Sequence, residues 1–193
     1  MLKPILLLLP LLAACAATND SAPEEEPVAA FATTPPPDAN RMQPGHAPTP
    51  YSADQIRAAC AEGAFREYET TERNVTQRMR MVFRAEQDGQ AYVETELLAQ
   101  DGTVMTTLPG QPTPWTTLQG HASFPEQATV ITPCSHQTQA GTFDAWTYVV
   151  TGTDGAETIF VFARDLPGPP LDMTRRISFE EVSRMELVDY GPR

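Results

Sequence analysis

The chain has 193 residues, 25 of them acidic and 13 basic, and its formal net charge is −12. An acidic chain without a basic cluster argues against nucleic acid and against anionic lipid headgroups as partners. The length that remains after the first fifty residues suits one domain with one core.

The chain begins MLKPILLLLPLLAACAATND. Lys3 gives a positive start, and the apolar run over 5–12 is shorter than the ~20 residues that span a membrane, so we expect a cleavable export signal over residues 1–14. The LAAC stretch resembles the lipobox of bacterial lipoproteins. The resemblance implies that Cys15 becomes the first residue and carries several acyl chains, palmitate among them, which hold a protein stably at a membrane. Ala16 then favours the outer membrane; the alternative is an ordinary signal peptide with a chance cysteine.

Residues 15–50 are rich in proline and poor in large apolar side chains. Eight prolines lie between Ser21 and Pro50, and Glu24 to Glu26 repel one another. Such a segment cannot bury enough surface to offset its ordering entropy. We therefore expect an extended, disordered tether over 15–50, with His46 in solvent, and a β-rich globular domain over 51–193.

The domain is expected to open with one short helix. Ser52 and Gln55 have the spacing of a capping box, and Ile56 and Cys60 share one face of the helix. Gly63 is expected to end it.

The rest of the domain shows mostly strand periodicity, with apolar side chains at every second position. Eight strands are expected, at about 75–87, 90–99, 103–107, 128–139, 142–151, 157–163, 171–177 and 182–190. The last is open to a second interpretation, because Ser178 and Glu181 could cap a short helix. Short antiparallel strands at this spacing indicate a mainly β fold: an open barrel or strongly curved sheet of about 8–9 strands over the single helix.

The first expected hairpin allows its register to be argued. A three-residue loop, 87–89, would place Met81 opposite Thr95 and Phe83 opposite Val93. A two-residue loop would place glutamates opposite the same apolar side chains. The apolar pattern therefore favours the first register, which also sets Arg80 opposite Glu96.

Three later stretches carry a family resemblance: AGTFDAWTYVV, FARDLPGPPLDM and RMELVDY, in that order. Together they resemble the C-terminal half of uncharacterised exported β-rich bacterial proteins, whose folds are similar to the curved, helix-plugged half-barrel of the LolA/LolB lipoprotein carriers. The resemblance implies a fold and a place in the bacterial cell envelope, on the periplasmic side or at the outer membrane. It implies no catalytic residue.

A search for reactive groups finds little. Cys134 and His136 lie two residues apart on one side of a strand, which is a weak signal for a metal site or a Cys/His nucleophile. Acidic pairs such as Glu94 and Glu96 suit a solvated strand face better than catalysis. The arginines at 78, 80 and 84 form a stripe for which ion pairs with Glu94 and Glu96 are expected, with anion binding as the alternative. We expect no enzyme activity, no metal and no cofactor.

Two cysteines remain once Cys15 is acylated. In an oxidising compartment such a pair forms bridges, which predicts a disulfide between Cys60 and Cys134. The alternative is two buried free thiols.

The interior of the curved sheet is the remaining candidate site. Its expected lining consists of Met79, Met81, Phe83, Trp146, Tyr148, Phe160 and Phe162, with a mouth near Trp115 and His121. Either these side chains close a compact core, or they leave a cleft for an apolar ligand.

Three functions follow. The first is a membrane-anchored envelope lipoprotein that binds a lipid or acyl chain. The second is a structural or interaction lipoprotein, with a filled core, that docks onto an envelope protein complex. The third, a hydrolase, would need a buried cysteine, histidine and acid together.

Overall fold

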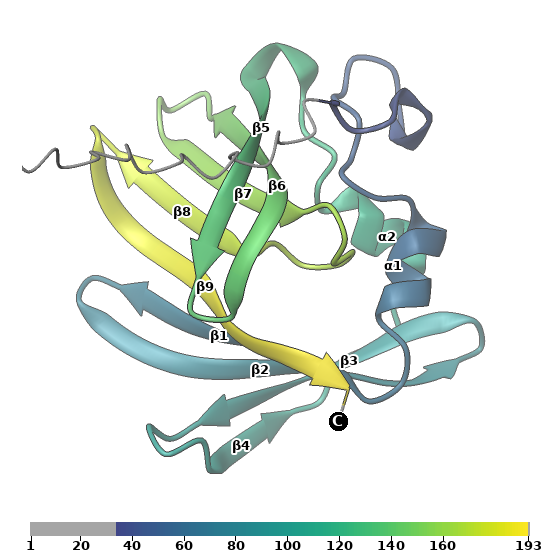
Figure 1. Cartoon of the computed structure of the whole chain (residues 1–193), viewed down its shortest axis with the longest axis vertical. Helices are drawn as coiled ribbons and strands as arrows, with labels where there is room; N and C mark the ends of the chain where they lie inside the picture. Colours follow the sequence, from purple (N-terminus) through teal and green to yellow (C-terminus); the bar gives the residue numbers. More distant parts are fainter. Residues whose placement is uncertain (1–33, 193) are drawn as a thin grey trace, which may run out of the picture. The chain divides into compact units, whose positions relative to one another are not determined.

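The computed structural model describes residues 34–192. The expected signal peptide, Cys15 and the first part of the expected tether lie outside the described residues. The described chain forms one antiparallel sheet of nine strands in the order β4-β3-β2-β1-β9-β8-β7-β6-β5 (Figure 1). The two edge strands, β4 and β5, have no strand on their outer sides, so the sheet is not closed, and the expectation of a mainly β, strongly curved open sheet is confirmed.

The strands cover most of the chain beyond residue 63. Their bounds are β1 Ala64–Glu72, β2 Val75–Gln87, β3 Gln90–Leu98, β4 Val104–Leu108, β5 Thr129–Thr138, β6 Gly141–Thr151, β7 Glu157–Ala163, β8 Asp172–Ile177 and β9 Glu180–Pro192. The helical interpretation of the last segment is wrong, because β9 begins directly after a two-residue turn.

The expected helix is present as α1, Ala53–Ala59, and Ser52 and Gln55 form both hydrogen bonds of the capping box. It ends earlier than expected, at Cys60, and Gly63 instead turns the chain into β1 with φ of 85°. A second helix, α2 Trp115–Gly120, lies between the expected strands 103–107 and 128–139, where no helix was expected, and Pro114 precedes it. The remaining helical turns are η1 Asp38–Asn40 and η2 Glu126–Ala128. Within residues 34–192, no helix has the length and apolar character needed to cross a membrane.

Strand β1 was not expected from the sequence. It lies in the middle of the sheet, between β2 and β9. Its three buried positions are Arg66, Glu67 and Tyr68, so two of the three carry a charge. Because charged residues are almost never fully buried without a partner, a sequence pattern based on apolar alternation passes over such a strand.

The β2–β3 hairpin has the register chosen from the sequence. Met81 faces Thr95, Phe83 faces Val93, and Arg80 faces Glu96. The turn, however, is the two-residue Asp88-Gly89, with φ of 50° and 74°, which is the type that matches strand twist. A register shift between 84 and 87 follows at once and restores the apolar pairing.

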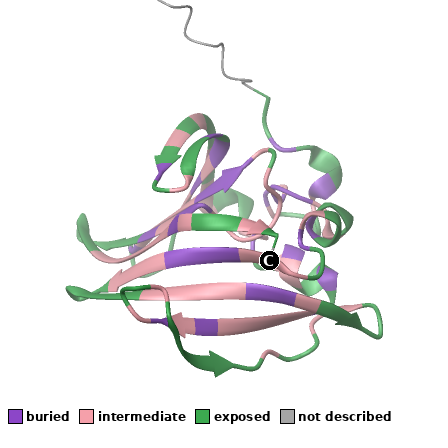
Figure 2. Cartoon of the chain, turned by 60° about the horizontal axis from the view of Figure 1, so that its bottom comes forward, coloured by how far each residue is buried: buried purple, intermediate pink, exposed green. Residues whose placement is uncertain are grey.

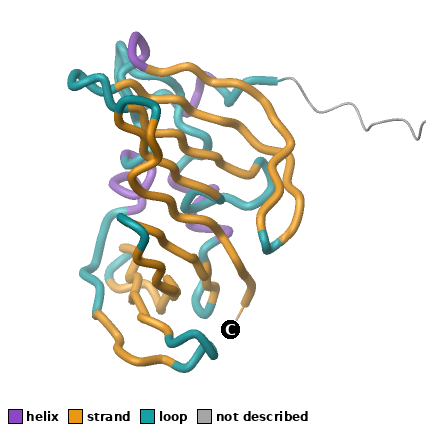
Figure 3. Tube along the Cα trace, turned by 90° about the vertical axis from the view of Figure 1, so that its left-hand side faces the viewer, coloured by secondary structure: helices purple, strands orange, loops and turns teal. Residues whose placement is uncertain are grey.

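The sheet is bent so strongly that its two ends lie at a steep angle to each other, and β9 runs along both parts (Figures 1 and 3). Buried residues gather toward the middle of the strands, and residues at the hairpin tips are exposed (Figure 2). The core has two clusters. The first, on the face covered by the helices, includes Tyr51, Ile56, Trp146, Tyr148 and Phe162; the second includes Tyr68, Phe143, Val161, Leu171 and Leu187.

The prediction of a disordered tether is wrong for residues 34–50. This segment, which we call the strap, packs on the domain through backbone groups. The carbonyl oxygen of Thr34 accepts from Trp146 Nε1 at 2.9 Å and from Arg164 Nη2 at 2.9 Å, and Pro48 O accepts from the Tyr148 hydroxyl at 2.9 Å. His46, expected in solvent, is half-buried, and its Nδ1 lies 3.0 Å from Ser123 Oγ. The ordered domain therefore begins well before residue 51.

Candidate functional site

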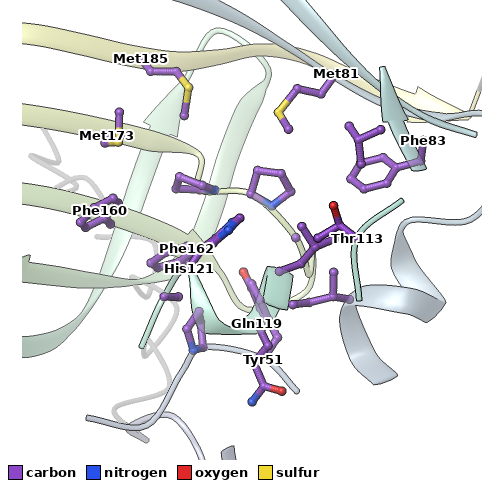
Figure 4. Close-up of a pocket in the computed structure, with 18 of the residues that line it drawn as sticks. Tyr51, Met81, Phe83, Thr113, Gln119, His121, Phe160, Phe162, Met173 and Met185 are labelled. Carbon is purple, nitrogen blue, oxygen red and sulfur yellow. The ribbon is translucent and has the colours of Figure 1, made fainter. Parts of the chain in front are cut away.

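The helix-covered face of the sheet contains a cavity of about 380 Å³ (Figure 4). Its volume falls within the range of small-molecule sites, ~300–1,000 Å³. Most of the lining is apolar. It comes from both halves of the sheet, from α1 and α2, and from the loop between β7 and β8: Tyr51, Ile56, Met81, Phe83, Val93, Leu118, Phe160, Phe162, Pro169, Pro170, Met173 and Met185 are among its residues.

Four of the seven lining residues expected from the sequence do line this cavity: Met81, Phe83, Phe160 and Phe162. The other three lie elsewhere. Met79 packs against the second core cluster. Trp146 and Tyr148 are on the correct face, but the strap covers them and they are buried in the first cluster.

The methionines give the cavity its character. Met81, Met173 and Met185 come from three different strands and surround one side of it (Figure 4). All three are half-buried. Thioether side chains have many rotamers and fill irregular space, so a wall made of them can adjust to the shape of a guest. Met173 and Met185 were not expected, although each lies at the same period of two as its apolar neighbours.

The expected mouth is only partly as predicted. His121 is exposed and lies at the cavity, together with Gln119 (Figure 4). Trp115 is buried elsewhere, and its Nε1 donates to Glu86 at 2.7 Å. The pKa of the Glu86 carboxyl is lowered by hydrogen bonds from Arg57, the larger cause, and from Trp115.

Gln119 fixes the helical cover of the cavity. Its Oε1 accepts from the backbone of Ala53 at 2.9 Å, and its Nε2 donates to Asn40 O at 3.2 Å and to Thr49 Oγ1 at 3.0 Å. One buried amide therefore joins α2 to α1 and to the strap. Because a buried amide that loses its partners costs about 1–3 kcal/mol, this junction is held in one arrangement.

The expected disulfide between Cys60 and Cys134 is not formed in the structure; both are free thiols. Cys60 lies in the first core cluster, with Sγ 3.7 Å from Pro167 O. Cys134 Sγ lies 3.1 Å from Thr147 Oγ1 on the adjacent strand and packs against the second cluster. Burial raises the pKa of the Cys60 thiol to about 11.

Of the histidines considered for a reactive site, His136 faces an acid. Its Nε2 lies 3.6 Å from Asp172 Oδ2, and Asp172 also accepts from Arg184 Nη2 at 2.8 Å. Desolvation, the largest cause, would raise the pKa of Asp172, but its interactions with His136, Arg184 and Thr174 outweigh desolvation and lower that pKa. The hydrogen bond of Cys134 goes to Thr147, and within residues 34–192 no group of His, Cys, Asp and Glu could hold a metal ion.

The arginine stripe makes the expected ion pairs with Glu94 and Glu96, and two further pairs with a third glutamate. Arg84 lies 2.6 Å from Glu94, and Arg80 lies 3.3 Å from Glu96. Glu67, on the unexpected strand β1, adds pairs to Arg80 at 2.7 Å and to Arg78 at 2.5 Å. This cluster lies on the face opposite to the cavity, so it is a support for the sheet and not part of the site.

Two polar residues on the cavity side of the sheet have no such pairing, and sequence reasoning missed both. Arg66 is 3% exposed, and its Nη1 donates to the carbonyl of Phe65 at 2.8 Å, while its Nε has no hydrogen-bond partner among the described residues. Tyr68 is 0% exposed, and its hydroxyl also lacks a partner in the described part of the chain. Burial raises the pKa of Tyr68. The sequence feature that could have indicated their strand is Asn74, a residue suited to the positive φ of the turn at 73–74 that follows β1.

Comparison with known proteins finds no family model that matches the chain and no curated protein that matches it. The fold is similar to solved structures at low identity. The crystal structure of MucB is 14% identical, with 72% of this chain and 56% of that chain covered and a TM-score of 0.47. The complex structure of Pseudomonas aeruginosa MucA/MucB is 13% identical, with 72% and 54% covered and a TM-score of 0.47. This chain thus spans little more than half the length of the chains it matches.

Proposed function

We propose that this chain is a bacterial envelope lipoprotein whose domain binds an apolar ligand, a lipid or single acyl chain, in the cavity on the helix-covered face. The cavity itself is the observation that supports the proposal. A core that only had to be filled would leave no space of about 380 Å³ between methionines and phenylalanines, since protein interiors are close-packed.

The position of the cavity also supports ligand binding. Its walls come from strands at both halves of the sheet and from two short helices joined by Gln119. Exposed His121 marks the outer end of the lining.

Membrane anchoring belongs to the same proposal and rests on the LAAC sequence. Mass spectrometry of the mature protein should find acyl chains on Cys15, and a Cys15→Ser chain should stay uncut and lose its partition into detergent. A mature protein without acyl mass on Cys15 would end this part of the proposal without touching the cavity.

Binding is tested on the chain from residue 15 onward with Cys15→Ser, which leaves it free of its own acyl chains. We expect a fluorescent fatty acid to bind at micromolar strength. Met81→Arg places a charge in the apolar lining and should abolish binding, while the matched Met105→Arg, on exposed β4, should bind normally. Circular dichroism and thermal melting report whether each variant is folded.

Met81→Arg could fail to fold, since Met81 also touches the second core cluster. Val93→Phe then decides, because it fills the cavity with apolar volume and adds no charge. Binding unaffected by a folded Val93→Phe, or no binding by the unaltered chain, would refute the cavity as a ligand site.

A second candidate function is docking onto an envelope protein, and strand β4 favours it. All five of its residues are exposed, and Val104, Met105 and Leu108 are large apolar side chains on a sheet edge with no charge in the strand. Exposed edges of this kind accept an extended segment of another chain. Absence of fatty-acid binding would leave this candidate as the better one.

A further inference from the structure

We propose that the ligand of the cavity is an anionic amphiphile, a fatty acid with a free carboxylate, and that Arg66 and Tyr68 receive its head. This inference rests on the proposed function and adds the chemistry of the ligand's polar end.

The buried guanidinium of Arg66 is the first observation. Nearly every other buried charge in the described sheet is paired: Glu67 and Glu96 with arginines, Asp172 with Arg184. Arg66, at 3% exposure, forms no ion pair with any carboxylate of residues 34–192. Its partners are the carbonyl of Phe65 and the ring of Tyr190, whose centroid lies 5.7 Å from Cζ. A buried cation without a counter-charge costs several kcal/mol, so a missing anion is the natural explanation.

The hydroxyl of Tyr68 is the second observation. It is a hydrogen-bond donor in a fully buried position, without a partner among the described residues. Tyr68 lies two residues from Arg66 on the same face of β1. Burial raises the pKa of Tyr68, and the charge of Arg66 opposes that rise. Two unsatisfied donors side by side suit the two oxygens of a carboxylate.

The third observation is that these donors lie on the sheet face that carries the apolar cavity. Arg66 lies directly opposite Met81 in the β1–β2 pair, so the two side chains share a face, and Met81 lines the cavity. Burial is the main influence on the pKa of Tyr51 and of Cys60 and raises both, while the nearby charge of Arg66 lowers them slightly. Tyr51 lines the cavity, and Cys60 Sγ lies 3.1 Å from the position of a Cβ on Gly168, another lining residue. Neither Arg66 nor Tyr68 lines the cavity itself, so the carboxylate would be held just beyond the apolar lining.

The experiment compares the binding of two ligands of equal chain length, dodecanoate and uncharged dodecanol, at pH 8. It uses the chain from residue 15 onward with Cys15→Ser. The unaltered protein should bind dodecanoate at least about tenfold tighter than dodecanol, because hydrogen bonds to a charged group contribute ~1.5–3 kcal/mol. Arg66→Met should remove this preference by weakening dodecanoate alone and leave the affinity for dodecanol unchanged. Its fold should persist, since the variant removes a buried charge that has no counter-charge and leaves no partner charge behind.

One further variant serves as the control, and another tests Tyr68. Arg176→Met removes the same charge from an exposed position on β8 and should keep the preference intact. Tyr68→Phe deletes one hydroxyl and should reduce the preference severalfold; it decides the matter if Arg66→Met does not fold.

The outcomes distinguish carboxylate recognition by Arg66 and Tyr68 from apolar ligand binding in the cavity. Equal binding of both ligands by the unaltered chain, or a preference that survives Arg66→Met and Tyr68→Phe, overturns the carboxylate inference and leaves the apolar cavity standing. Binding of neither ligand overturns the proposed function as well.

Discussion

At the scale of single residues, buried charge separates the two faces of this sheet. Glu67, on the side away from the cavity, is satisfied by Arg78 and Arg80. Arg66, one position earlier and on the cavity side, is not satisfied by an acid. Adjacent residues of one strand thus have opposite electrostatic situations, because successive side chains point to opposite faces.

Asp172 gives a residue-scale prediction about pH. Its folded-state pKa is lowered below the ordinary 3.8, so its contribution to stability is present above that value and is lost as the pH falls through the lowered pKa. Asp172→Asn should therefore reduce the free energy of unfolding at pH 7 by about 1–2 kcal/mol, a figure discounted for the partial exposure of Arg184. Urea unfolding at pH 7 and below pH 3.8 measures the difference between variant and unaltered chain, which should shrink in acid.

The matched control is Asp154→Asn, since Asp154 is exposed and its contact with Arg175 is 3.9 Å. It should change stability little at either pH. A difference between Asp172→Asn and the unaltered chain that stays constant with pH would show that packing, rather than charge, explains the effect.

At the scale of elements, the hairpin turns differ in how well their residues suit the positive φ angles that they adopt. The β2–β3 turn uses Asp88-Gly89, a pair suited to two positive φ angles. The β8–β9 turn places Ser178 at φ of 52° and Phe179 at 68°, and Phe179 is 94% exposed. A bulky side chain in the left-handed region is strained, and this one has little burial to offset the strain.

Replacing Ser178-Phe179 by Asn-Gly should therefore stabilise the domain by about 1 kcal/mol, through relief of the left-handed strain. Thermal or urea unfolding measures the gain. Asp88→Asn, in a turn that is already suitable, serves as the comparison and should change little. Loss of stability on the Asn-Gly replacement would contradict the prediction that the left-handed conformation of this turn is strained.

The elements also show what apolar periodicity can and cannot predict. Alternation in 75–87 was enough to predict β2, two of its cavity-lining side chains and its register with β3, because a slip by one residue would expose Met81 and Phe83. It did not show that Met79, on the same face, packs in the second core cluster. The same reasoning missed β1, since Arg66 and Glu67 occupy positions where the pattern requires apolar residues. Arg66, on which the carboxylate proposal rests, is therefore one of the residues whose charge kept β1 from being predicted.

At the scale of the whole domain, the position of the strap determines which aromatic side chains are buried in the core and which line the cavity. Trp146 and Tyr148 point to the same face as Phe160 and Phe162, and the sequence cannot distinguish them. The strap covers the first two through the carbonyls of Thr34 and Pro48. Proline-rich composition predicted disorder here, but small buried residues and hydrogen bonds to backbone carbonyls supply order that hydrophobicity does not register.

Removal of the strap should consequently destabilise the domain. A chain beginning at residue 51 should have a free energy of unfolding lower by at least about 3 kcal/mol than one beginning at residue 34, because Trp146 and Tyr148 lose their cover and their hydrogen-bond acceptors. Urea unfolding of the two chains gives the comparison. Equal stability of the two would restore residue 51 as the true start of the folded domain.

If Cys15 carries the proposed lipid anchor, the ordered strap also limits how far the domain could travel from the membrane. An anchor at Cys15 would leave residues 15–33 as the leash, with an upper limit on its reach of about 65 Å. A leash running to residue 50 would have reached about 120 Å. A partner or ligand source would therefore have to come within this shorter radius, and lengthening the leash with added residues would widen the zone that one anchored molecule can sample.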